Sequence, residues 1–181
     1  MANLYDLLEH INFVPEDLEE IEGALENVID TINSKAEENK IPKSLGFLKF
    51  GSIARKTKIN PLNDVDVIYI LGEAEKQGDS NNHIITKCSF PFDDNWKEPE
   101  DNISSLYILN SIKKYIKETY STSDITKNQE VVNVFLSSYE VGFDIVPAFN
   151  ITNTNYYLMP SGGGEHNWKK TNPQYGEELF L

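Results

Sequence analysis

Apolar residues recur along this chain with a helical period in two stretches. Between residues 16 and 39 they return every three or four positions, as they do along one face of an α-helix. Pro15 suits the first turn of that helix. Residues 102–120 repeat the pattern, with Asp101 or Asn102 as the expected N-cap. The pattern therefore predicts two amphipathic helices.

Shorter runs rich in β-branched and aromatic residues predict strands. The clearest covers residues 65–71, and the others are residues 45–50, 131–137, 139–149 and 155–159. Residues 72–100 are polar and lack a period, which predicts a long surface insertion. The order of helices and strands predicts an α+β fold with a mixed sheet flanked by helices, in one domain over residues 1–181.

The charge of the chain limits its partners. A formal net charge of −13 does not suit a protein that grips long DNA or RNA, which needs a basic stripe along its surface. The densest basic cluster is Arg55, Lys56 and Lys58, too small for a duplex but adequate for one triphosphate. Metal ions can add the positive charge that an acidic protein lacks. We therefore expect a nucleotide rather than a long nucleic acid.

The single cysteine, Cys88, excludes an internal disulfide and favours a reducing cytoplasm. The first ten residues lack the cationic and apolar segments of a signal peptide. No stretch approaches the roughly 20 apolar residues of a membrane helix. We expect a cytoplasmic protein with no membrane contact.

Two aspartates stand at the start of the clearest strand. Asp64 and Asp66 are two positions apart, so in a strand they share one face at a spacing of about 6.6 Å. Like charges this close favour divalent cations between them, and Mg²⁺ prefers carboxylate oxygens. The alternative is a chance pair at a solvated turn, but the apolar run after Asp66 favours the metal site.

A third aspartate, Asp144, interrupts the apolar stretch 141–147. A buried carboxylate needs a partner or a metal ion, since leaving it unpaired costs several kcal/mol. The alternatives are a salt bridge to a lysine or an edge position that faces water. If its strand lies beside the strand after Asp66, three carboxylates converge on one point.

Gly51 and Ser52 follow another predicted strand and offer a small residue, a hydroxyl and backbone N–H groups to a phosphate. An ordinary turn with a helix cap is the alternative. Arg55 is either a further phosphate contact or a solvated charge. Trp168 could stack on a base or pack in the core.

Three blocks together resemble the signature of the bacterial cGAS/DncV-like nucleotidyltransferases of the polymerase β superfamily. They are Gly51-Ser52-Ile-Ala-Arg55-Lys-Thr57, Asp64-Val-Asp66-Val and Phe143-Asp144-Ile-Val-Pro147-Ala-Phe149. The later run from Tyr156 to Pro173 is similar to the segment that follows the third aspartate in that family.

The resemblance implies a polymerase β-like core in which Asp64, Asp66 and Asp144 hold two Mg²⁺ ions, with Mn²⁺ as a substitute. Gly51 and Ser52 would hold the triphosphate of ATP, GTP or another nucleoside triphosphate. Such enzymes make cyclic di- or trinucleotides in bacterial anti-phage signalling, in some cases with a regulatory partner protein. They carry a helical domain after the core. The sequence ends at Leu181, about where that domain would begin, so we expect this domain to be absent.

Two other functions remain open at this level. One is a polymerase β-type enzyme that adenylylates a protein, a drug or an RNA end, the last disfavoured by the net charge of −13. The other is an inactive nucleotide-binding module that scaffolds a partner, which the complete set of three aspartates argues against.

Overall fold

The computed structural model describes residues 15–38, 44–50, 64–77, 84–88, 103–139, 141–162 and 168–173. Two helices and eight strands lie in this part of the chain. In chain order they are α2 (Pro15–Glu38), β1 (Gly46–Phe50), β2 (Asp64–Gln77), β3 (Ile84–Cys88), α4 (Ser105–Thr119), β4 (Asp124–Lys127), β5 (Val132–Leu136), β6 (Val141–Ile151), β7 (Tyr157–Pro160) and β8 (Trp168–Thr171).

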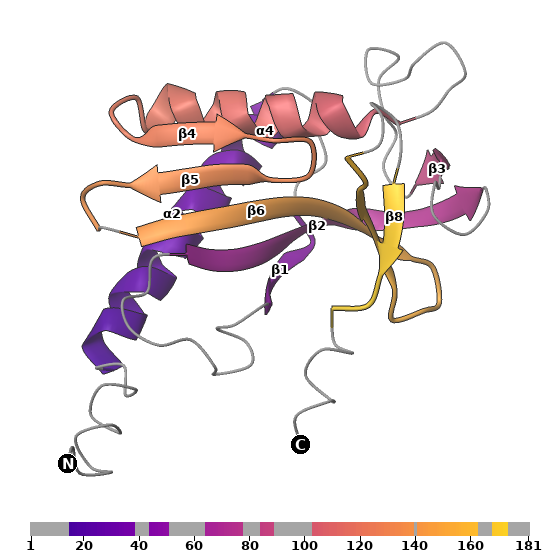
Figure 1. The fold of residues 1–181 in the computed structure, drawn as a ribbon, viewed down its shortest axis with the longest axis horizontal. Coiled ribbons are helices and arrows are strands. Elements are labelled where there is room, and N and C mark those ends of the chain that lie inside the picture. The colour runs from indigo at the N-terminus through magenta and orange to yellow at the C-terminus, as the bar shows by residue number, and fades with distance from the viewer. Residues whose placement is uncertain are drawn as a thin grey trace, which may run out of the picture.

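The strands form one mixed sheet whose main path is β1-β2-β6-β5-β4 (Figure 1). β2 and β6 run parallel at its centre, and the other pairs of neighbouring strands are antiparallel. β3 pairs with the far end of β2, and β7 links β6 to β8. The α+β class and the mixed sheet predicted from the sequence are confirmed.

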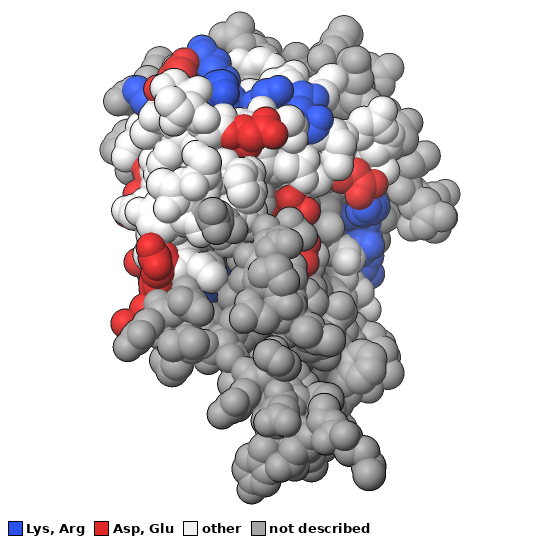
Figure 2. All heavy atoms as spheres, turned by 60° about the vertical axis from the view of Figure 1, so that its left-hand side comes forward, with Lys and Arg blue, Asp and Glu red and all other residues white. Residues whose placement is uncertain are grey.

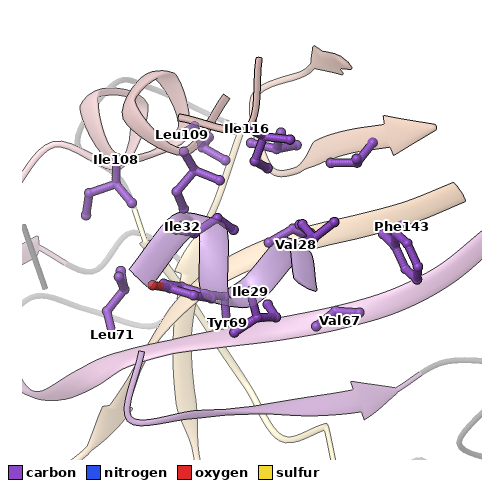
Figure 3. Close-up of a cluster of buried hydrophobic side chains, with 14 of the residues drawn as sticks. Val28, Ile29, Ile32, Val67, Tyr69, Leu71, Ile108, Leu109, Ile116 and Phe143 are labelled. Atoms are coloured by element: carbon purple, nitrogen blue, oxygen red, sulfur yellow. The ribbon is translucent and has the colours of Figure 1, made fainter. Parts of the chain in front are cut away.

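Both helices pack on one face of this sheet. Figure 3 shows apolar side chains of α2 and α4 meeting side chains of β2 and β6, and all of those labelled belong to one buried cluster. On β2 every second residue, Val67, Tyr69 and Leu71, points into it because side chains alternate along a strand. The opposite face of the sheet is therefore the one that remains for a site.

A polar cluster ties α2 to the entry of β1. The Tyr69 hydroxyl donates to Asn33 Oδ1 at 2.7 Å, and the Ser44 N–H lies 2.8 Å from the same oxygen. Burial raises the pKa of Tyr69, so the hydroxyl keeps the proton that it donates. Leu45 N–H then donates to Ile70 O at 2.8 Å. These bonds fix where β1 starts beside β2.

The surface insertion expected over residues 72–100 is wrong in part. β2 continues to Gln77, and Ile84–Cys88 form β3, which pairs antiparallel with that extension. The signal was present, since Ala74 is buried between exposed Glu73 and Glu75, the alternation of a half-buried strand. The remaining residues of the expected insertion lie outside the described ranges.

The expected start of the second helix is also wrong. α4 begins at Ser105, and its N-cap is Ser104, whose hydroxyl accepts from the Tyr107 N–H at 3.2 Å, instead of Asp101 or Asn102. Ile103 is held in extended form because its N–H donates to Ile85 O of β3 at 2.8 Å. That tertiary bond delays the helix until the next serine can cap it.

Neither helix in the described part of the chain is long and apolar enough to cross a membrane. In Figure 2, basic side chains gather at the upper edge of one face, with acidic side chains among and below them. On the coloured part of this face the basic groups do not form a continuous stripe.

Candidate functional site

Two of the three predicted aspartates lie side by side on the central strands. Asp66 of β2 and Asp144 of β6 are register partners in the parallel pair. Both are half-buried, whereas their chain neighbours Val65, Val67 and Phe143 are buried in the core beneath the helices. Because side chains alternate along a strand, both carboxylates project from the face opposite the helices.

For the third aspartate, Asp64, the structure describes only the backbone. β2 begins at Asp64, which pairs with Gly142, but its side chain lies outside the described residues. Gly51, Ser52 and Arg55 lie outside them as well. Among the side chains that the structure describes, no group of three His, Cys, Asp or Glu residues could hold a metal ion. The full triad and the phosphate-binding turn therefore stay predictions.

Asp144 has a neutral partner. Asn133 of β5 is its register neighbour across the antiparallel pair, and Asn133 Nδ2 donates to Asp144 Oδ1 at 2.7 Å. Since β6 lies between β2 and β5, the alternative of an edge position is wrong. An amide orients a carboxylate without cancelling its charge and occupies one of its several acceptor positions. Within the described part of the chain, this bond leaves the negative charge of Asp144 uncancelled, so the carboxylate could attract a cation.

A cavity of about 840 Å³ opens in front of the two carboxylates. This volume falls within the roughly 300–1,000 Å³ typical of small-molecule sites. Its lining combines the carboxylates with apolar side chains of the sheet and with polar groups from two loops: Phe50, Asp66, Asn128, Gln129, Glu130, Val131, Asp144, Val146, Met159, Ser161, Gly162 and Lys169. The cavity is large enough for a nucleotide, with hydrogen-bonding groups at two separate places.

The turn between β4 and β5 forms one wall of the cavity. Asn128 Oδ1 accepts from the N–H groups of Glu130 at 2.7 Å and Val131 at 2.9 Å, so the turn is held by its own side chain. From the other side, Lys169 of β8 pairs with Glu130 at 2.6 Å. The sequence analysis did not identify this wall. Asn128 is a common turn residue, and no local sequence pattern indicates that its turn contacts Lys169.

Trp168 belongs to the core. Its side chain is fully buried, and its indole N–H donates to Ile103 O at 3.0 Å. Its ring meets Phe149 edge-to-face, with 5.4 Å between centroids and 71° between planes. Of the two roles considered for this residue, the structure confirms core packing.

Asn133 is expected to be a positioning residue for Asp144. If Asp144 holds a metal ion, as predicted from the sequence, Asn133→Ala should lower activity by about 10–100-fold, the usual loss when a partner of a metal-binding side chain is removed. It should also raise the Mg²⁺ concentration needed for half-maximal thermal stabilisation, which a purely structural role would leave unchanged. Asn110→Ala, at an exposed position of α4, is the control. Unchanged Mg²⁺ dependence in Asn133→Ala would contradict this role.

Two comparisons with known proteins show what the sequence is similar to. Residues 77–179 match the Second Messenger Oligonucleotide or Dinucleotide Synthetase domain family. Over 141 residues the chain is 34% identical to a probable cyclic nucleotide synthase of Bacillus cereus (strain VD146). That alignment covers 73% of this chain and 42% of the relative, so the matched part spans less than half of that protein.

Proposed function

This chain belongs to the family of second messenger oligonucleotide or dinucleotide synthetase domains, and from that premise we propose that it is the catalytic core of a nucleotidyltransferase making cyclic di- or trinucleotides. The observation that carries the proposal is the pairing of Asp66 with Asp144 in register at the floor of the cavity. The relative's name, a cyclic nucleotide synthase, supports the same class of product.

The residues at this floor suit divalent cations. Asp66 and Asp144 are adjacent carboxylates, and Asp144 accepts from a neutral amide; carboxylate oxygens are the hard, anionic donors that Mg²⁺ prefers. Asp66 and Asp144 would hold the ions, with Asp64 as the third ligand proposed from the sequence. When bound, the ions would lower the pKa of the attacking hydroxyl and offset the charge of the leaving pyrophosphate.

The chain's own groups would orient the reactants. Asn133 fixes one oxygen of Asp144, so that carboxylate presents a constant direction to the cavity. Ser52 and the backbone near it would hold the β- and γ-phosphates. In each step the hydroxyl loses its proton to solvent, its oxygen bonds to the α-phosphorus, and the bond from that phosphorus to the bridging oxygen breaks, which releases pyrophosphate. No protein nucleophile is needed, and the last such step, within the linear di- or trinucleotide intermediate, closes the ring.

The wider setting is proposed from the resemblance described above. We place the enzyme in cytoplasmic anti-phage signalling, with nucleoside triphosphates as substrates and a regulatory protein as a partner. The acidic net charge of −13 supports small nucleotides over long nucleic acids as substrates.

Incubation with labelled nucleoside triphosphates and Mg²⁺, followed by chromatography, tests the proposal. We expect a cyclic product that resists phosphatase because it has no free terminal phosphate. A linear or protein-linked product would show a different nucleotidyltransferase. Thermal stabilisation by triphosphate and Mg²⁺ without turnover would show a binding module.

A further inference from the structure

The wall of the cavity carries an ion pair that the proposed chemistry does not use. Lys169 Nζ lies 2.6 Å from Glu130 Oε2, and the two residues come from different segments, β8 and the β4–β5 turn. Their side chains are 38% and 43% exposed, and a pair this exposed adds little to folding stability. Both line the cavity that contains Asp66 and Asp144. The pair is thus positioned to meet whatever occupies the cavity.

The carboxylate of Glu130 is held in a defined place. The Asn128 side chain fixes the backbone of its turn, and Lys169 holds one carboxylate oxygen. On the other side lies Gly162, whose φ of +69° is a left-handed conformation that favours glycine. A Cβ at this position would stand 3.0 Å from Glu130 Oε1. Because glycine has no Cβ, the carboxylate of Glu130 has room at this position. The ion pair is therefore largely pre-organised before a ligand binds.

A carboxylate beside an ammonium presents a particular pattern of hydrogen-bonding groups. The carboxylate accepts at two oxygens, with about four acceptor positions, and the ammonium has three donors, so each can bind a ligand while the two stay paired. Guanine offers the matching edge, with two neighbouring N–H donors and the O6 acceptor beside them. Adenine and cytosine each offer one amino group on that edge, and uracil offers one N–H between two carbonyls.

We propose that Glu130 and Lys169 read the base of a bound nucleotide and favour guanine. Glu130 accepts from the ring N–H and the 2-amino group, and Lys169 donates to O6. The inference rests on the proposed function, since it takes the cavity to be the nucleotide site, and it adds a substrate preference to that function.

Inosine triphosphate tests the contact to Glu130, because it differs from GTP only in lacking the 2-amino group. The protein should bind GTP at least about tenfold more tightly than inosine triphosphate, as expected for one lost hydrogen bond to a charged group. Glu130→Gln should reduce that ratio to less than about threefold, since one acceptor oxygen becomes a donor. Binding is measured by calorimetry with non-hydrolysable analogues of the two nucleotides.

Lys169→Gln tests the contact to O6 separately. Because GTP and inosine triphosphate share O6, this variant should keep most of the ratio between their two affinities. It should reduce the ratio between the affinities for GTP and ATP. The pair Lys114–Glu118 on α4 is the matched control, since it lies outside this cavity and Glu118 is 46% exposed. In Glu118→Gln and Lys114→Gln, the affinity for GTP relative to inosine triphosphate and relative to ATP should be the same as in the wild type.

Two results would overturn the inference. An equal loss of affinity for all nucleotides in Lys169→Gln would show a phosphate contact. An unchanged ratio of the affinities for GTP and inosine triphosphate in Glu130→Gln would show that the base is not read there.

A failure of the proposed function can be distinguished from a failure of this inference. If the wild-type protein makes cyclic products without a preference for guanine, only this inference is wrong. If it binds GTP selectively but forms no product, only the proposed reaction is wrong.

Discussion

Asp144→Asn is expected to lower nucleotide incorporation by on the order of 10³-fold or more, since single charged groups at a reacting phosphate commonly contribute that much. Asp144 and Asp66 are register partners at the floor of the cavity, so each would contribute one negative charge to the carboxylate pair there. Replacing either carboxylate by a neutral amide would remove a proposed cation ligand with little change of shape. Asp66→Asn should therefore behave in the same way.

The fold should tolerate this change. The side-chain carbonyl that Asp144→Asn introduces can still accept the Asn133 amide hydrogen. The substitution also removes repulsion between two neighbouring carboxylates, so without divalent ions its Tm should equal or exceed that of the wild type. Added Mg²⁺ should raise the Tm of the wild-type protein and leave that of the variant unchanged.

Labelled product formation and thermal unfolding with and without Mg²⁺ measure both effects. Asp124→Asn is the control, because it makes the same chemical change at an exposed position at the start of β4. If Asp144→Asn forms product at the wild-type rate, the carboxylate pair is not the catalytic centre and the proposed function is wrong.

Trp168→Ala should cost about 3–5 kcal/mol of unfolding free energy, the usual range for deleting a fully buried large aromatic side chain. The indole fills the space beside Phe149 and provides the donor for Ile103 O. Trp168→Phe keeps most of the packing but leaves that carbonyl without its donor, so we expect a smaller loss of about 1–3 kcal/mol.

Urea unfolding of the variants provides these values. Tyr156→Ala is the control, because Tyr156 is an exposed aromatic residue. Lys170 Nζ lies over its ring, 3.6 Å from the centroid. That exposed cation–π contact contributes about 0.5–1 kcal/mol. A loss below about 1 kcal/mol in Trp168→Ala, together with weaker nucleotide binding, would contradict the structural role.

The elements with a long periodic pattern could be predicted from the sequence alone. α2 and the strands β1 and β6 lie within one or two residues of their predicted bounds, because α2 buries one regular face and the two strands are mostly apolar runs. β4 and β8 were missed. Their sequences, Asp-Ile-Thr-Lys and Trp-Lys-Lys-Thr, are short and largely polar, and they become strands by pairing with β5 and β7.

The sequence by itself singled out Asp66 and Asp144 as the residues that we propose for the chemistry, since both are acidic groups in apolar strands and such groups need a partner or a cation. Only the tertiary structure decided that they are neighbours, because the parallel register of β2 and β6 joins segments distant in the chain. It alone also placed Asn133 against Asp144 and Lys169 against Glu130. Such contacts depend on the order and register of strands, which local periodicity does not encode.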